Sequence, residues 1–305
     1  MNILVIGLGS MGNRRLRCLK YINNKFKLYG YDLDIKRVNN AKNIHGINVY
    51  DKYENYFNNN IDLIIISTPP DKHEFYILDA INRKIKFFVE AGVFNDTTKK
   101  IQSLLLKNNV IGMPSSTLIH HPAIIKIKNI IKNNKLGSIS NIIYHSGQYL
   151  PDWHTYEHVK DYYVSNKDTG GAREIVPFEL TWMVQVFGFP NYVFGNNKKT
   201  ILIDGAENID DTYNIILEYD NFSINLIVDV VSRFATRNLT VNGSDAQLIW
   251  AWENDEIIIR NNDNIEKISY EKLDADDNYN ANISEEMYIN EMQFLMWIEF
   301  FKSSS

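Results

Sequence analysis

Three glycines near the N-terminus have the spacing of a phosphate-binding turn. Gly7, Gly9 and Gly12 fit the pattern G-x-G-x-x-G directly after the apolar segment 2–6, and a helical pattern begins close to Ser10 and Met11. In this context the first glycine permits a tight turn, the second lets the backbone approach a pyrophosphate, and the third allows close helix–strand packing. A helix that begins here would offer unpaired backbone N–H groups to phosphates. The pattern predicts a bound dinucleotide; the alternative is a glycine-rich turn without a ligand.

An acidic residue follows at the distance that a ribose-binding carboxylate requires. Asp32 ends the second apolar segment, 27–31, and stands 20 residues after Gly12. A carboxylate at this place accepts hydrogen bonds from ribose hydroxyls and repels a 2′-phosphate, so we expect NAD rather than NADP. Asp34 is a rival for this role but lies past the strand, and Arg37 is poorly spaced to bind a 2′-phosphate.

Length, charge and cysteine content narrow the class of protein. A chain of 305 residues suggests two domains, at ~150 residues each. The net charge of −5 and the absence of a basic cluster disfavour a nucleic-acid binder. The single cysteine, Cys18, excludes an internal disulfide and fits a reducing compartment. No apolar run is long enough to span a membrane and no secretory signal is evident, so we expect a cytoplasmic protein.

The two halves of the chain have different patterns, which predict an α/β protein. Up to residue 118, short apolar strands alternate with helices, as in a doubly wound parallel sheet. Residues 119–305 begin with a helix near 123–134, a strand near 140–148 and a helix near 172–187, and continue as an antiparallel strand meander. A last helix is expected at 284–301. The prediction is therefore a dinucleotide-binding domain, 1–118, and a substrate and oligomerisation domain, 119–305.

Several motifs in this order resemble the Gfo/Idh/MocA oxidoreductases. They are the segment 3–12, the run Ser-Thr-Pro-Pro-Asp-Lys-His at 67–73, the pair Val89-Glu90, and Gly170-Gly171 before a helix. The resemblance covers residues 1 to about 190. It implies a Rossmann domain followed by an α+β domain with a large, open, mostly antiparallel sheet. It also implies a nicotinamide cofactor, a sugar, polyol or nucleotide-sugar substrate, and a homodimer or homotetramer formed through the open sheet.

The loop that follows the strand 61–67 lies where open α/β sheets bind ligands. Pro69 and Pro70 restrict this loop, and Ser67, Thr68 and His73 could approach the cofactor. We therefore assign Thr68, Pro69, His73 and Glu90 to the cofactor site. The alternative for His73 is a surface position at the start of a helix.

The resemblance fails at the positions that handle protons. The family motif Glu-Lys-Pro reads Glu90-Ala91-Gly92 here, so its lysine is missing. Aligned from Gly170-Gly171, Ile175 replaces the family's aspartate and Glu179 its histidine. A buried carboxylate can act as a general base. We therefore expect Glu179 to be the base and Glu90 to be a further catalytic residue. The alternative is a Glu179 that is structural or only holds the substrate.

The segment 149–163 combines aromatic, acidic and basic side chains, a mixture that suits a polyol or sugar. Lys160 and Tyr163 could replace the missing lysine, and Trp153, His154, Tyr163, Arg173 and Glu174 are expected to bind substrate. A solvent-exposed loop or an oligomer contact is the alternative. His154 and His158 lack further ligands with a metal-site spacing, so we expect no metal.

These residues together predict an NAD(H)-dependent oxidoreductase that acts on a hydroxyl or keto group of a sugar, polyol or nucleotide-sugar. Two other readings stay open: a cofactor-binding protein without dehydrogenase activity, and a redox-neutral epimerase or lyase that retains NAD. We expect no nucleic-acid or membrane partner.

Overall fold

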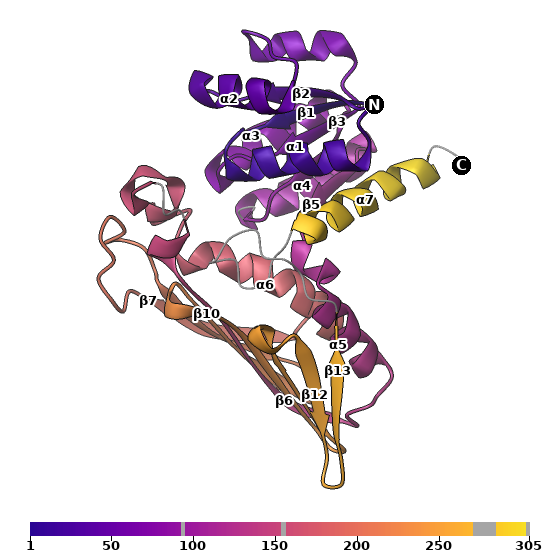
Figure 1. Ribbon diagram of the computed structural model, residues 1–305, viewed down its shortest axis with the longest axis vertical. Helices are drawn as coiled ribbons and strands as arrows, with labels where there is room; N and C mark the ends of the chain where they lie inside the picture. Colours follow the sequence, from indigo (N-terminus) through magenta and orange to yellow (C-terminus); the bar gives the residue numbers. More distant parts are fainter. Residues whose placement is uncertain (93–94, 154–156, 271–284, 303–305) are drawn as a thin grey trace. The chain divides into compact units, whose positions relative to one another are not determined.

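The computed structural model describes residues 1–92, 95–153, 157–270 and 285–302, and the chain divides into two compact units (Figure 1). Unit 1 comprises Met1–Ser115 and Tyr288–Ser305, and unit 2 comprises Ser116–Met287. These units divide the chain after Ser115, whereas the expected domains 1–118 and 119–305 divide it after residue 118, and they group the segment from Tyr288 onward with unit 1. No helix in the described part of the chain is long and apolar enough to cross a membrane.

Unit 1 is built on a five-stranded parallel sheet with the strand order β2-β1-β3-β4-β5. The central strands are apolar along their whole length: all four residues of β3 are buried, as a strand covered on both faces requires. The strands span β1 Asn2–Ile6, β2 Lys27–Tyr31, β3 Leu63–Ile66, β4 Lys86–Val89 and β5 Gly112–Pro114. The strand order reverses between β1 and β3, because β2 is added on one side of β1 and β3, β4 and β5 follow on the other. Open parallel sheets bind ligands at the carboxyl ends of the strands at such a switch point.

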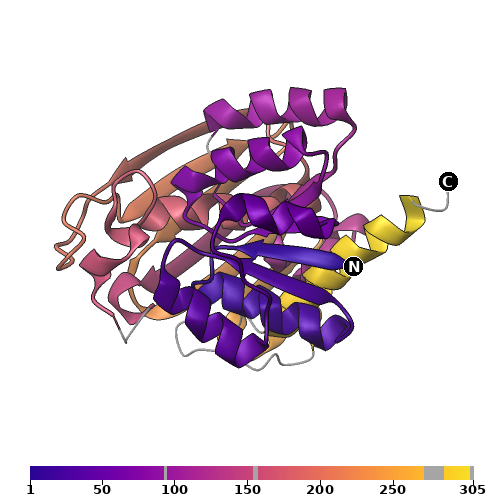
Figure 2. The same ribbon diagram turned by 90° about the horizontal axis from the view of Figure 1, so that it is seen from above.

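Helices cover both faces of this sheet (Figure 2). Helix α1 contacts α2, and α3 contacts α4. These helices span α1 Ser10–Ile22, α2 Ile35–His45, α3 His73–Asn82 and α4 Asn95–Asn108, with short 3-10 turns η1 Tyr53–Asn59 and η2 Pro70–Lys72. The strand expected at 48–50 is reduced to one parallel bridge between Tyr29 and Asn48. The Tyr50 side chain instead packs on Tyr29 and Tyr56, so aromatic packing replaces further strand pairing here.

Helix α7 spans Glu285–Lys302, and its residues from Tyr288 onward belong to unit 1. Its buried residues include Tyr288 and Glu291. The Arg14 and Arg15 guanidinium groups of α1 lie over the Tyr288 ring, at 4.7 and 5.0 Å from its centroid. This helix is therefore held to α1 by contacts between residues more than 270 positions apart.

Unit 2 contains an eight-stranded sheet with the order β13-β12-β11-β10-β6-β9-β8-β7. All neighbours are antiparallel except β6 and β9, which are parallel. The expected simple meander is therefore wrong in one respect, because β6 lies in the middle of the sheet between β9 and β10. The strands span β6 Ile139–Tyr149, β7 Tyr192–Lys198, β8 Thr212–Glu218, β9 Ser223–Asp229, β10 Val231–Gly243, β11 Gln247–Ala251, β12 Glu256–Arg260 and β13 Ile265–Ser269.

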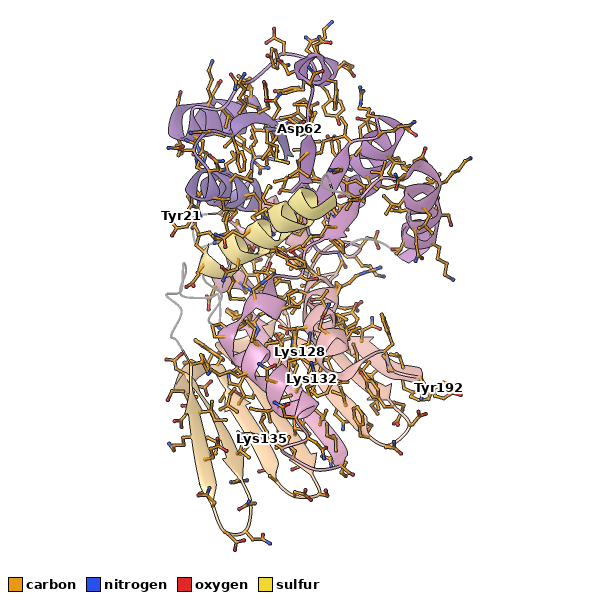
Figure 3. The ribbon with its side chains drawn as sticks, turned by 90° about the vertical axis from the view of Figure 1, so that its right-hand side faces the viewer. Tyr21, Asp62, Lys128, Lys132, Lys135 and Tyr192 are labelled. Atoms are coloured by element: carbon orange, nitrogen blue, oxygen red, sulfur yellow. The ribbon has the colours of Figure 1, made fainter. Side chains whose placement is uncertain are left out.

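The helices α5, Pro122–Lys132, and α6, Ala172–Phe187, pack on one face of this sheet (Figure 1). Tyr144 and Trp182 are fully buried there, with their rings in edge contact at 5.1 Å. Helix α5 turns Lys128 and Lys132 away from the sheet, and Tyr192 extends from the edge strand β7 (Figure 3). Helix α6 begins after Gly171, whose φ of +68° suits glycine, and it contains Pro177.

Candidate functional site

The glycine turn of unit 1 has the geometry that a pyrophosphate site requires. Gly7 has a φ of +86°, and a Cβ at Gly12 would lie 1.8 Å from the carbonyl oxygen of Gly7. Gly9 differs, because a Cβ there would meet only Arg37 Nη1, at 3.7 Å. Gly7 and Gly12 are thus demanded by the fold, whereas the space at Gly9 is open to a ligand. No side chain caps the first turn of α1. The backbone N–H groups of Ser10 and Met11 are therefore available to a phosphate.

Asp32 lies against this turn. Its Oδ2 accepts a hydrogen bond from the backbone N–H of Leu8 at 2.8 Å, and its Oδ1 accepts one from Asp34 N at 2.9 Å. The rival Asp34 instead caps α2 by accepting from Lys36 N. Arg37 Nη1 lies 4.0 Å from Asp32 Oδ2. The Arg37 guanidinium group therefore pairs with this carboxylate and is not available to bind a 2′-phosphate. The geometry favours Asp32 as the ribose carboxylate.

The loop after β3 brings two buried polar atoms to the same edge. His73 is buried, not a surface residue, and its Nε2 lies 2.7 Å from the carbonyl oxygen of Thr68, so Nε2 donates. Burial lowers the pKa of His73, against the opposing effect of this hydrogen bond, and keeps the ring neutral. Within the described residues His73 Nδ1 and Thr68 Oγ1 have no hydrogen-bond partner. Pro69 precedes the turn η2 that positions both residues. Unpaired buried polar atoms of this kind suit a ligand rich in amide and hydroxyl groups.

Glu90, at the end of β4, is held by a cation that the sequence interpretation missed. Arg15 Nε and Nη2 donate to the two oxygens of Glu90 at 2.7 and 2.8 Å, and Ser67 Oγ donates to Oε1 at 3.3 Å. Arg15 Nη1 also donates to Glu291 Oε2 at 2.8 Å. Burial alone would lower the pKa of Arg15, but Glu90 and Glu291 outweigh it and raise that pKa. Both oxygens of Glu90 are occupied by donors of the described chain, two of them from the buried Arg15, so we regard Glu90 as a positioning group rather than a proton carrier.

Glu179 of α6 is fully buried in unit 2. Its Oε2 accepts hydrogen bonds from Tyr144 Oη and Trp182 Nε1, both at 2.8 Å. Its Oε1 accepts from Ser146 Oγ at 2.8 Å and from Arg237 Nε at 3.0 Å. Four donors, one of them cationic, therefore occupy both oxygens of Glu179. This geometry fits the structural alternative for Glu179 better than the expected role of general base, because both of its oxygens already have donors.

Glu174, five residues earlier, has the opposite surroundings. Tyr163 Oη donates to Glu174 Oε1, and Oε2 is buried without a partner among the described residues. Burial raises the pKa of Glu174 to about 7, although the Tyr163 hydrogen bond opposes the shift. A carboxylate with such a pKa can exchange a proton near neutral pH.

The other residues that were expected to bind substrate differ in their exposure. Trp153 is half-buried and its Nε1 has no hydrogen-bond partner in the described part of the chain, whereas Arg173 and Lys160 are exposed. His154 lies outside the described residues. No group of three potential metal ligands occurs among the residues that the structure describes, and His158 instead lies 3.3 Å from Asp204.

The partners of two buried arginines, Arg15 and Arg237, could not be predicted from the sequence. Arg15 sits three residues after Gly12, but neither its spacing nor its type indicates a partner at Glu90 or Glu291. Arg237 lies in an ordinary alternating strand, where a buried cation is unexpected. Only the juxtaposition of distant segments reveals both.

Comparison with known proteins agrees with this geometry. Residues 1–110 match the model of the Gfo/Idh/MocA oxidoreductases, described as an oxidoreductase family with an NAD-binding Rossmann fold. No curated protein matches the chain significantly in sequence.

Solved structures of low sequence identity share the fold. An oxidoreductase from Agrobacterium radiobacter, in complex with NAD+, L-tartaric acid and magnesium, is 13% identical with a TM-score of 0.83, over 100% of this chain and 89% of that one. Levoglucosan dehydrogenase in complex with NADH is 14% identical with a TM-score of 0.79, over 96% and 87% of the two chains.

The WlbA dehydrogenase from Bordetella pertussis, in complex with NADH and UDP-GlcNAcA, is 11% identical with a TM-score of 0.73, over 82% and 73% of the chains. The predicted resemblance and fold class are confirmed, and so, at the level of the family, is NAD as the cofactor. Residues 1–110 of the chain are therefore similar to the Gfo/Idh/MocA oxidoreductases, a family with the NAD-binding Rossmann fold.

Proposed function

We propose that the protein is an NAD(H)-dependent oxidoreductase that acts on a hydroxyl or keto group of a sugar, polyol or nucleotide-sugar. The observation that carries this proposal is the turn 7–12, which leaves open space at Gly9 while Asp32 binds its backbone. A turn built only for packing needs Gly7 and Gly12 but has no use for open space at Gly9.

The substrate class rests on the polar and aromatic side chains of unit 2. Trp153 and Tyr163 offer rings that stack on a sugar face, and Arg173 and Glu174 offer hydrogen-bonding groups for hydroxyls. Two structures of similar fold were solved as levoglucosan dehydrogenase and as a dehydrogenase with a bound nucleotide-sugar. Both support a carbohydrate substrate for this chain.

Each part of the chain has a separate task in the reaction. The chemistry that NAD+ would supply when bound is that of a hydride acceptor. The N–H groups at Ser10 and Met11 would hold its pyrophosphate, Asp32 would hold its ribose, and Thr68 and His73 would offer it buried hydrogen-bonding atoms. The neutral His73 ring places no competing positive charge there.

The test is formation of NADH from NAD+ with a panel of polyols, aldoses and UDP-sugars, followed by NADH absorbance and product analysis. Stoichiometric NADH and a keto product support the proposal. Calorimetric NAD binding without turnover on any compound would favour a cofactor-binding protein without dehydrogenase activity, a reading that Ala91 in place of lysine keeps open. Product without net NADH would indicate a redox-neutral epimerase or lyase.

We also propose that the chain forms a homodimer or homotetramer through the open face of its eight-stranded sheet. The strand registers place Phe194, Ile216, Asn225 and Ile143 in one transverse row on the face opposite α5 and α6, and three of these four side chains are apolar. The exposed fractions of Phe194, Ile216 and Ile143 are 57%, 39% and 49%. Exposed apolar side chains gathered on one face of a sheet are typical of a protein interface.

A further inference from the structure

The first turn of α6 carries a carboxylate for which the fold provides too few partners. Glu174 Oε1 accepts a hydrogen bond from Tyr163 Oη. Glu174 Oε2 is buried and has no hydrogen-bond partner within the described residues. A buried carboxylate oxygen without a donor costs free energy that folding does not recover, so such an atom calls for a functional explanation.

Glu179 on the same helix shows what a structural carboxylate looks like in this protein. It has four donors, including the buried Arg237, and both of its oxygens are occupied. No cation is bonded to Glu174 in the described chain, and Tyr163 is its single hydrogen-bond donor there. The two side chains therefore differ in their surroundings, although they share residue type and helix.

We infer that Glu174, held by Tyr163, is the acid–base residue of this enzyme. The inference rests on the proposed function and deepens it by naming the group that exchanges the substrate proton. The family's lysine position holds Ala91, which has no titratable group, and its histidine position holds Glu179, whose two oxygens are occupied by four donors. Glu174 stands one residue before the position of the family's aspartate.

The step balances with the proposed cofactor. The substrate O–H bond breaks and its proton goes to Glu174 Oε2, while the C–H bond breaks and its hydride reduces NAD+. A carbonyl group forms, so the carbon is oxidised and the cofactor is reduced. In the reverse direction, protonated Glu174 returns its proton to the oxygen. Tyr163 keeps its own proton and fixes the orientation of the carboxylate through Oε1.

The electrostatic surroundings suit this role. Burial raises the pKa of Glu174 to about 7, and the Tyr163 bond is the opposing influence. Among the described residues Tyr163 is the titratable group that faces the carboxylate; the neighbouring Arg173 side chain is exposed. Oxidation should therefore accelerate as the pH rises through about 7, because the base must be ionised.

A direct titration tests the protonation without any substrate. Infrared difference spectra of the full chain should show a carboxyl-to-carboxylate conversion near pH 7 that is absent in Glu174→Gln and retained in Asp168→Asn. Asp168 is an exposed carboxylate in the adjoining loop. Tyr163→Phe should move the midpoint upward, since its hydrogen bond lowers the pKa. A midpoint of an ordinary solvent-exposed glutamate would overturn the inference.

The second measurement is turnover on whichever polyol or UDP-sugar the wild type oxidises. Glu174→Gln should lose ~10²–10⁴-fold in kcat with an unchanged calorimetric Kd for NAD, and Asp168→Asn should retain full turnover. Tyr163→Phe should shift the pH profile upward. Normal kcat in Glu174→Gln overturns the inference but leaves the proposed function standing. Wild-type protein that oxidises nothing overturns both.

Discussion

At the residue scale, Asp32 is the group on which the preference for NAD depends. Asp32→Ala should weaken NAD binding by roughly 10–100-fold, because hydrogen bonds to a charged acceptor contribute roughly 1.5–3 kcal/mol. Calorimetric titration measures this change, and Asp34→Ala is the matched control, since Asp34 only caps α2. Tighter binding of NADP than NAD by the wild type would contradict the assignment.

Two glycines of the same turn should respond differently to a side chain. Gly9→Val should abolish NAD binding and leave the circular dichroism spectrum unchanged, because the space there is open in the fold. Gly12→Ala should instead lower the melting temperature, since its Cβ would overlap the Gly7 carbonyl oxygen. If Gly9→Val still binds NAD normally, the pyrophosphate does not lie at this turn.

Glu179 should matter for stability rather than for chemistry. Glu179→Gln leaves the buried Arg237 without its counter-charge, and breaking a buried ion pair costs about 3–5 kcal/mol in the free energy of unfolding. Thermal unfolding should show a large drop in the melting temperature relative to Asp168→Asn. An unchanged melting temperature together with lost turnover would restore Glu179 as the base.

At the scale of elements, the attachment of α7 depends on one buried cluster. Arg15 binds Glu90 and Glu291 together, and Ser115 Oγ donates to Glu291 at 3.1 Å. Glu291→Ala should therefore release α7 from α1, which limited proteolysis within 285–302 would detect. Glu286→Ala removes an exposed carboxylate from the same helix and should not increase cleavage. Equal cleavage of the two variants would mean that the apolar contacts of α7 suffice.

At the scale of the whole molecule, the open face of the eight-stranded sheet predicts self-association. Light scattering after size exclusion should give the mass of a dimer or tetramer, and Phe194→Asp should shift it toward the monomer by placing a charge in the apolar row. Leu106→Asp, at an exposed apolar site on α4 of unit 1, is the control and should leave the mass unchanged. A monomeric wild-type protein would contradict the proposed self-association through the sheet.

Local sequence patterns were sufficient to predict the helices and strands and the glycine turn 7–12. The continuous apolar run of β3 indicates a strand buried on both faces, and glycine spacing next to a strand predicts a phosphate turn because only backbone geometry is involved. The bounds of α6 and β12 follow from local periodicity and turn residues in the same way. Such signals act over a few neighbouring residues, so the sequence alone reveals them.

The roles of charged side chains depended on tertiary structure. The sequence favours Glu179 over Glu174 as the base, but only the positions of Tyr144, Ser146 and Arg237 on distant strands show that the oxygens of Glu179 are already occupied. Glu291 joins unit 1 because Arg15 lies across from it, not because of anything in its own segment. The pKa and the partners of a buried charged side chain are determined by atoms that the fold brings together from distant segments. A local sequence pattern therefore does not predict them.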